Sequence, residues 1–570
     1  MRPVTNPVLP GCHPDPSVCR VGDVYYLVVS SFGYYPGIPV YRSTDLVDWE
    51  LVGHVLDRPG QLDLTGLDLS DGIWASTIRH HDGVFYVVSG IARGRTGAST
   101  FVVTATDPAG PWSDPVELDA QGIDPSLFFD DDGRCWFTGA RDAPEPAVTG
   151  PGELWLRELD LDTLRLVGPE HVLWHGALRG QWVEGPHLYK RDGRYLLLAA
   201  EGGTERNHAV TAASATHVTG PYVTDPRSPL LTHRHLGPDH PVQNVGHADL
   251  VDTPSGQTWA VVLGVRAVDD THVLGRETFL VPVEWSAAGP VFAPGAGAIH
   301  VGEAATAAPV EVLDLAAPLA AQGWASLRGP VTGLVEPVPD GLLLTPAGAD
   351  LAGRGTPTFV ARRQQHPRFR TRTRLRADGL TGAEQAGVVA FLHQDRFVTH
   401  ALGVDADGSR EVRVTAWTSA GGHVLGRAPL PGDSATLLIT GDDSAYTFAL
   451  ETGAEQTVVA AVDRAFLSTE VAGGFLGVHL GVFADGASGP STAQALVEAF
   501  SYEPLAAPRQ QRPGPADRQR GGAVLRRTTS SGSSLRWPTT SPRSAARRDS
   551  IAASPRAAKS WRTVVSAGTR

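Results

Sequence analysis

Three carboxyl side chains recur at matching places in the sequence. Asp15 stands in HPDPSV, Asp124 in IDPSLF and Glu184 in VEGPHL, and each precedes a glycine turn that leads into an apolar run. Two further copies of the phrase carry Trp74, in IWASTI, and His247, in GHADLV, at this place. Because the offsets to the turns agree closely, we expect the five side chains to be structurally equivalent. The alternative, that the acidic residues only form turns, does not explain why they stand beside apolar runs.

Carboxyl groups in such a set are typical of enzymes that cleave glycosidic bonds. One carboxyl must be protonated, so that it can give a proton to the leaving oxygen. A second must be ionised, either to activate water or to attack carbon. A third carboxylate nearby keeps the acid protonated by like-charge repulsion. Asp15, Asp124 and Glu184 would supply these groups, and Trp74 would offer an apolar face to a sugar ring.

Other chemistries find less support in the sequence. Arg276, in LGRETF, could bind sugar hydroxyls or the carboxylates, and the alternative is a surface ion pair with Glu277. His13, His247 and the carboxylates could hold a divalent cation on a central axis near His247, although their irregular spacing is a weak metal signal. We expect no required cofactor. Serine-nucleophile, phosphate-loop and HExxH motifs in suitable context are absent from the sequence.

The repeated phrase also predicts the fold. A glycine turn followed by an aromatic-rich apolar run is typical of a β-hairpin. Recurrence at about 50 to 60 residues favours a propeller, in which the first strand of each blade lines the axis. The turn glycines are Gly22, Gly83, Gly133, Gly193 and Gly256. We therefore predict an all-β protein that begins with a five-bladed β-propeller.

Composition divides the chain into four parts. Residues 1–300 hold the repeats, and the Ala-, Gly- and Pro-rich residues 301–325 read as a linker. Residues 326–504 contain short alternating runs without the repeat, which predicts an antiparallel β-sandwich. Residues 505–570 hold 13 Arg and one Lys against two Asp with few apolar residues, which predicts a disordered basic tail. A nucleic-acid role for this tail and its accidental addition to the chain are both open.

Charge and cysteine content limit which binding partners and which cellular location are expected. The net charge is −13 despite the basic tail, so the body of the chain is acidic and nucleic acid is not an expected partner. No apolar run is long enough to span a membrane, and the first residues lack the apolar stretch of a secretory signal. Cys12, Cys19 and Cys135 show no metal-type spacing and favour a reducing, cytoplasmic location.

The sequence between Asn6 and Pro504 resembles glycoside hydrolase family 43, in its β-xylosidase branch with an added sandwich domain. Several segments together carry the resemblance, namely NPVLPGCHPDPSVCRVGDVYYLVVSSFGYYPGIPVYRSTDLVDWELVGH, GIWASTIRHHDGVFYV, GIDPSLFFDDDGRCWF, QWVEGPHLYKRDGRYLLLAAEGGTERNHAV, THRHLGPDHPVQNVGHADLV and LGRETFLVPVEW. The resemblance implies a five-bladed propeller and an inverting mechanism. It also implies an exo-acting enzyme that removes xylose from the non-reducing ends of short β-1,4-xylo-oligosaccharides.

The resemblance assigns a role to each candidate residue. Asp15 would be the general base, Glu184 the general acid, and Asp124 the residue that tunes the pKa of the acid. The substrate pocket would be lined by Phe32, Trp74, Ala75, His247 and Arg276. In the sandwich domain, Phe475 is the candidate for an aromatic side chain that closes the pocket. Relatives of this kind often form dimers or tetramers, so self-association is expected as an option.

Three functions remain in competition at this point. The first is an inverting β-xylosidase acting on small oligosaccharides. The second is an α-L-arabinofuranosidase, alone or as a second activity, because the two pentoses present similar hydroxyl groups. The third is a non-catalytic carbohydrate-binding propeller, which would not need three carboxyl groups at equivalent positions.

Overall fold

The computed structural model describes residues 4–93, 98–178, 182–302, 310–377, 379–380, 384–405, 407–430, 432–486 and 491–506. They all belong to one compact unit, Met1–Ala507. The predicted basic tail lies outside the described residues except for its first two positions. The described helices are single turns: α1 (Pro146–Thr149), α2 (Thr469–Ala472), and the 3₁₀ turns η1 (Ala320–Gln322) and η2 (Arg464–Leu467). The predicted all-β class is confirmed, and no described helix has the length and apolar character needed to span a membrane.

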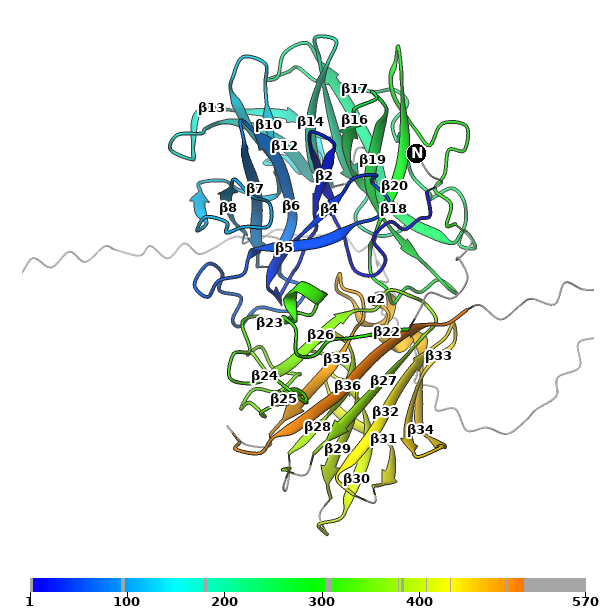
Figure 1. The fold of residues 1–570 in the computed structure, drawn as a ribbon. Coiled ribbons are helices and arrows are strands. Elements are labelled where there is room, and N and C mark those ends of the chain that lie inside the picture. Colours follow the sequence, from blue (N-terminus) through cyan, green and yellow to red (C-terminus); the bar gives the residue numbers. More distant parts are fainter. Residues whose placement is uncertain are drawn as a thin grey trace, which may run out of the picture. The chain divides into compact units, whose positions relative to one another are not determined.

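Five antiparallel sheets of four strands each make up the described chain up to Phe292 (Figure 1). In chain order their strands are β1 (Ser17–Val21), β2 (Val24–Val28), β4 (Gly37–Ser43) and β5 (Glu50–Leu56); β6 (Gly72–His81), β7 (Val84–Ala92), β8 (Ala98–Ala105) and β9 (Val116–Leu118); β10 (Ile123–Phe129), β11 (Cys135–Asp142), β12 (Gly152–Asp160) and β13 (Arg165–Trp174); β14 (Val183–Arg191), β15 (Arg194–Glu201), β16 (Ala209–Ala215) and β17 (Val223–Thr224); β18 (Val242–Asp252), β19 (Thr258–Arg266), β20 (Glu277–Ser286) and β21 (Gly289–Phe292).

The repeated glycines form the turns between the first two strands of each sheet, as predicted. All five have a positive φ, from 61° at Gly22 to 85° at Gly133, which L side chains rarely adopt. A Cβ atom at any of these positions would meet no heavy atom within 4 Å. The repeat therefore preserves glycine for its backbone conformation rather than for lack of space.

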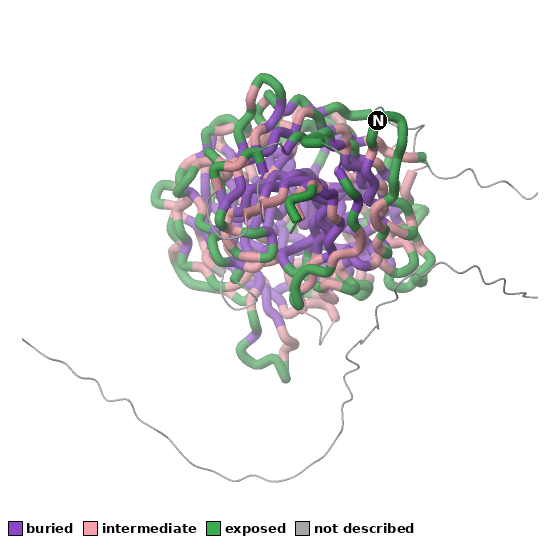
Figure 2. The backbone as a smooth tube through the Cα atoms, turned by 90° about the horizontal axis from the view of Figure 1, so that it is seen from below, coloured by how far each residue is buried: buried purple, intermediate pink, exposed green. Residues whose placement is uncertain are grey.

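Packing between the sheets runs from each one to the next. The first strands contact one another in the order β1, β6, β10, β14 and β18, and β18 also contacts β1. Apolar clusters among the described residues lie between successive sheets, and one cluster joins the first sheet to the fifth, for example through Val18, Leu27 and Val261. In Figure 2 the buried segments accordingly gather inside the view, and exposed segments lie at its rim.

Two larger antiparallel sheets form the rest of the described chain, which confirms the predicted β-sandwich (Figure 1). One sheet runs β24 (Val335–Val338), β25 (Gly341–Leu344), β36 (Ala495–Pro504), β27 (Phe369–Arg376), β32 (Ser434–Gly441), β33 (Ala445–Thr452) and β34 (Glu455–Asp463). The other runs β26 (Thr358–Arg363), β35 (His479–Asp485), β28 (Gln385–His393), β29 (Arg396–Val404), β30 (Arg410–Thr418) and β31 (Gly421–Pro429). A single apolar core, which includes Phe359, Phe391 and Phe448, draws on both sheets.

The stretch predicted as a linker partly belongs to the sandwich. β22 (Glu311–Val312) pairs with β36, and Trp324 is buried in the sandwich core. The Ala-, Gly- and Pro-rich composition obscured these contacts, because a strand of two residues has no readable alternation. A further short pair, β3 (Tyr34–Tyr35) with β23 (Ser326–Leu327), connects this region to the first sheet system. The sandwich and the repeats are thus joined by backbone hydrogen bonds.

Candidate active site

A residue with a left-handed φ occurs at a corresponding place in each repeat, two residues before β1 and within β6, β10, β14 and β18. These residues are Asp15 (φ 55°), Ala75 (φ 36°), Asp124 (φ 54°), Gly185 (φ 57°) and His247 (φ 51°). The predicted equivalence is therefore wrong by one residue in two repeats, since Ala75 and Gly185 occupy the positions assigned to Trp74 and Glu184. The strand pairing is irregular at each of the four later positions, where a bulge is formed. A bulge redirects side chains. The candidate residue is the left-handed residue itself at Asp124 and His247, and it is the residue before it at Trp74 and Glu184.

Asp15 is a buried carboxylate held by cationic and hydroxyl donors. Its Oδ1 accepts a 2.6 Å hydrogen bond from Arg276 Nη1, and its Oδ2 accepts one of 2.6 Å from the Ser30 hydroxyl. Burial alone would raise the pKa of Asp15, but Arg276, His247 and Ser30 together lower it below its ordinary value. Asp15 is therefore ionised near neutral pH, as a base or nucleophile must be.

Asp124 has the opposite electrostatic surroundings. Its Oδ2 accepts a 2.9 Å hydrogen bond from the backbone N–H of Gly185, the residue that follows Glu184. Burial and the charges of Glu184 and Asp15 raise the pKa of Asp124 well above its ordinary range. The three carboxyl groups therefore form one electrostatically coupled cluster that retains a proton at a pH where an isolated carboxyl group is ionised.

Arg276 and His247 complete the surroundings of Asp15. The side chain of Arg276 is buried against Asp15, whereas Glu277 forms its ion pair with Arg266, at 2.7 Å. The alternative surface pair between Arg276 and Glu277 is thus wrong. His247 Nδ1 lies 3.9 Å from Asp15 Oδ1, and burial lowers the pKa of His247, so the ring is neutral near pH 7.

Aromatic side chains surround this polar cluster. The Phe32 ring lies 5.8 Å from the guanidinium carbon of Arg276, and so does the ring of Phe475, which comes from the sandwich. Phe475 also meets the Trp74 ring edge-on, with 5.6 Å between the ring centroids. Phe475 is 36% exposed, consistent with the side of a pocket. The structure thus brings the sandwich residue predicted to close the pocket together with three of the predicted lining residues.

Two residues of the site were not found from the sequence. The Ser30 hydroxyl donates to Asp15 and accepts a 2.7 Å hydrogen bond from the backbone N–H of Ala75, so it connects the first two repeats. His208 is buried near Asp15 and His247, and its Nδ1 lies 3.0 Å from the carbonyl oxygen of Asn244. Neither residue carries a charge or a repeated spacing that would mark it in the sequence.

Arg79 lies next to the site, one step further along the first strands, among other polar side chains. Arg79 Nη1 lies 2.9 Å from Asp249 Oδ2, and Arg79 Nη2 lies 2.9 Å from His187 Nδ1. The His187 and His247 rings are 6.4 Å apart. Among the described residues no group of three or more His, Cys, Asp or Glu side chains is placed to hold a metal ion.

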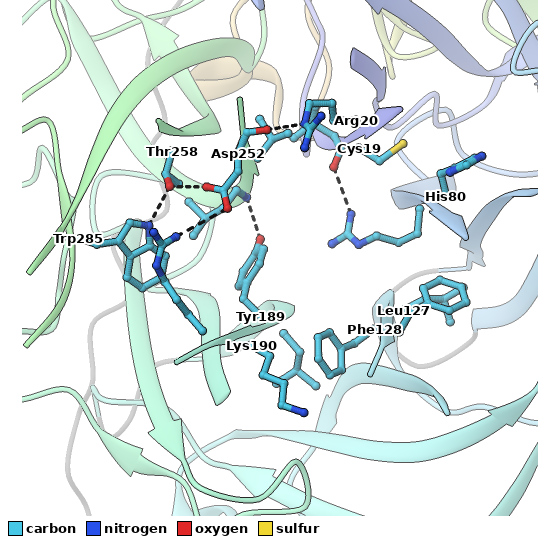
Figure 3. Close-up of a pocket in the computed structure, with 17 residues that line it drawn as sticks. Cys19, Arg20, His80, Leu127, Phe128, Tyr189, Lys190, Asp252, Thr258 and Trp285 are labelled. Carbon is cyan, nitrogen blue, oxygen red and sulfur yellow. Dashed lines mark hydrogen bonds and ion pairs between the residues drawn. The ribbon is translucent and has the colours of Figure 1, made fainter. Parts of the chain in front are cut away.

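A separate pocket of about 360 Å³ lies at the other end of the same strands (Figure 3). It is lined by the last residues of β1, β6, β10, β14 and β18, with Trp285 from β20. Its cations are paired, Lys190 with Asp130 at 2.6 Å and Arg191 with Asp252 at 3.7 Å. Because the carboxyl cluster stands at the opposite strand ends, this pocket is not the place where those groups meet a substrate.

A deeply buried carboxylate paired with a cation, beside two carboxyl groups that share a proton, can cleave a glycosidic bond. Comparison with known proteins decides the family, because the model of glycosyl hydrolases family 43 matches residues 4–291. The chain belongs to glycoside hydrolase family 43. A second model, the β-xylosidase C-terminal concanavalin A-like domain, matches residues 316–503. The resemblance drawn from the sequence is thereby confirmed, and the protein is a glycoside hydrolase.

Several known proteins are similar to the chain. A xylosidase/arabinosidase of Butyrivibrio fibrisolvens is 50% identical over 297 residues, which cover 51% of this chain and 57% of that protein. A non-reducing end α-L-arabinofuranosidase of Bacteroides ovatus is 34% identical over 88% of this chain and 94% of its own length. The crystal structure of a xylan β-1,4-xylosidase from Bacillus halodurans superposes with a TM-score of 0.82 at 32% identity, covering 88% of this chain and all of that one.

Proposed function

We propose that the protein is an inverting, exo-acting glycoside hydrolase that releases xylose from the non-reducing ends of β-1,4-xylo-oligosaccharides. The single observation that carries the mechanism is the electrostatic asymmetry of the carboxyl cluster. Arg276 is bonded to Asp15, whereas Asp124 and Glu184 face each other's charge. Such a separation of environments is how one site keeps one carboxyl ionised and another protonated at the same pH.

This asymmetry assigns the roles. Asp15 is the general base that takes a proton from the attacking water, and Glu184 is the general acid that protonates the leaving oxygen. Asp124 and Glu184 share a proton, and when it lies on Glu184 the charge of Asp124 keeps it there. Asp124 also orients the segment of Glu184 through its bond to Gly185. Inversion requires about 6.5–9.5 Å between the base and acid carboxyl groups, so that a water molecule fits on the far face of the sugar.

The five four-stranded sheets are the blades of one five-bladed propeller, and the first strands line its axis. Contact of β18 with β1 and the apolar cluster between the first and fifth sheets support this arrangement. The catalytic propeller spans about residues 1–300, and the sandwich follows it. We retain the cytoplasmic location and self-association as predictions of the sequence.

The pocket accepts a single terminal sugar. Phe475 from the sandwich meets Trp74 and approaches Arg276, so aromatic groups from two domains border the site on one side. A bordered pocket of this kind favours attack at chain ends over attack within a long chain.

An α-L-arabinofuranosidase activity is the second candidate. It is supported by the names of two relatives, a xylosidase/arabinosidase that is 50% identical and an α-L-arabinofuranosidase matched over 94% of its length. The carboxyl cluster suits either pentose, because the reaction centre is the same. The proportion of the two activities depends on contacts with sugar hydroxyl groups.

Proton NMR of xylobiose hydrolysis tests the proposal in one experiment. Release of xylose whose α-anomer appears before mutarotation supports both the substrate and inversion. Initial release of the β-anomer would contradict the role of Asp15 as a base. Rates on aryl β-xyloside and aryl α-arabinofuranoside, measured in parallel, separate the two candidates, and a protein that binds pentosides without cleaving either would refute the enzymatic proposal.

A further inference from the structure

Besides the aromatic contact of Phe475, its segment makes a polar contact with the loop between β19 and β20. His272, in the connection between β19 and β20, is engaged at three nitrogen atoms. Its backbone N–H donates to Glu470 Oε2 at 3.1 Å, its Nδ1 lies 2.5 Å from Glu470 Oε1, and its Nε2 lies 3.0 Å from the Thr469 hydroxyl. Although burial opposes it, the hydrogen bond and charge of His272 lower the pKa of Glu470, so this carboxylate is ionised.

Both chain segments that leave this contact lead into the site. On one side His272 is followed by the residues up to Arg276, and on the other side Glu470 is followed by those up to Phe475. The Val478 N–H donates to the Val273 carbonyl oxygen at 2.8 Å, which keeps the two segments together. A contact at one end of this pair of segments therefore fixes the positions of both side chains at the other end.

The fit between the two segments leaves no room for adjustment. A Cβ atom at Gly275 would lie 2.8 Å from the backbone nitrogen of Gly477, and one at Gly477 would lie 2.2 Å from the Leu274 carbonyl oxygen. On the far side, the Phe475 N–H donates to the Ser70 hydroxyl at 3.3 Å. The position of Phe475 is thus set by close backbone contacts. The His272–Glu470 pair adds a charged contact to them.

We propose that His272 and Glu470 form a clasp that holds Phe475 against the sugar pocket and thereby sets the affinity for substrate. The inference rests on the proposed function, because Phe475 is taken to border the sugar site. His272 and Glu470 are positioning residues, since neither is in contact with the carboxyl cluster. Loss of the clasp should weaken the binding of ground state and transition state alike, which raises KM and leaves kcat nearly unchanged.

Substitution at Glu470 tests this directly. We expect Glu470→Ala to raise KM for an aryl glycoside about tenfold with kcat within about twofold, and Glu470→Gln, which keeps a hydrogen-bond acceptor, to stay close to the parent. Glu311→Ala is the matched control, because Glu311 forms a similarly exposed ion pair at 2.8 Å with Arg362 inside the sandwich. Equal KM values for the Ala variant and the parent would overturn the proposal.

A double variant shows whether the clasp acts through Phe475. In a Phe475→Ala background, Glu470→Ala should have no further effect on KM, since the side chain that it positions is already absent. A tenfold rise in KM in that background as well would refute the clasp. Hydrogen exchange of the peptide 469–478 provides a readout that does not depend on the substrate. Faster exchange in Glu470→Ala supports the clasp, and unchanged exchange refutes it even if the enzyme proves to act on another glycoside.

Discussion

Replacing Arg276 by methionine should move the acid limb of the pH–rate profile to higher pH. The guanidinium bonds the Asp15 carboxylate at 2.6 Å, and both side chains are buried. Opposite charges about 4 Å apart at an effective dielectric constant of about 20 attract each other by about 4 kcal/mol. That energy corresponds to about three pKa units, and measured shifts beside a single opposite charge are about one to three.

The direction of the shift follows from the proposed role of Asp15. A base must be ionised, so kcat/KM falls as the pH drops through its pKa in the free enzyme. In the parent protein Arg276, His247 and Ser30 hold that pKa below the ordinary value of 3.8. Without the guanidinium, burial raises the pKa, and the limb should rise by about one to three pH units. The variant should lose far more activity at about pH 5 than at about pH 7.

The assay is the pH dependence of kcat/KM on an aryl glycoside, with intrinsic fluorescence to establish that each protein remains folded over the range. Arg276→Lys is the matched control, because it keeps the charge and loses only the second arm of the guanidinium. Its limb should stay within about half a unit of the parent, whatever the loss of overall rate. An Arg276→Met enzyme that remains measurably active with an unshifted acid limb would show that Arg276 does not control the ionisation of the base.

Three other comparisons test separate parts of the structure. Glu184→Gln should reduce hydrolysis of xylobiose by about 10²–10⁴-fold but spare aryl glycosides with good leaving groups, whereas Asp15→Asn should impair both. Equal losses for Glu184→Gln on the two substrates would contradict its role as acid. Arg79→Met leaves the buried Asp249 carboxylate without its cation and should lower the free energy of unfolding by about 3–5 kcal/mol in denaturant. A loss below about 1 kcal/mol would refute the importance of this pair. Gly185→Ala, whose Cβ would lie 3.1 Å from a buried imidazole ring, should destabilise more than Gly133→Ala, where the space is open. Identical unfolding midpoints for these two would exclude the crowding.

The repeats were readable in the sequence because turn chemistry is local. A glycine with positive φ between two strands leaves the same signal in every copy, so the hairpins at Gly22, Gly83, Gly133, Gly193 and Gly256 could be found without any tertiary information. The beginning of the sandwich was harder to place. β22 is two residues long, and the burial of Trp324 depends on strands far along the chain, which no local pattern reveals.

The structure brings the candidate site residues together, but not with the equivalence that the sequence predicts. Counting back from the turn glycines places Trp74 and Glu184 with the three other anchors, whereas the left-handed backbone positions are Ala75 and Gly185. The hairpin loops hold two residues after β6 and β14 but five after β10 and β18, so the distance from the turn glycine to the left-handed residue differs by one. The partners of the carboxylates were also hidden, because Ser30, which faces Asp15 across the β1–β2 hairpin, has no charge or repeated spacing that marks it.

The sandwich is part of the catalytic architecture rather than an appendage, because it holds the two segments that bring Asp15 and Arg276 together. Arg363 of the sandwich donates through Nε to the Cys12 carbonyl oxygen at 2.6 Å, three residues before Asp15. The neighbouring Gln365 carbonyl accepts a 3.0 Å hydrogen bond from Arg266, whose ion pair with Glu277 adjoins Arg276 in sequence. Glu277 in turn accepts from the Gly11 backbone at 2.7 Å. Asp15, the proposed base, and Arg276 therefore stand on segments fixed by the same few sandwich residues. A change at this junction should alter the pKa of Asp15 before it disturbs the fold of the four-stranded sheets.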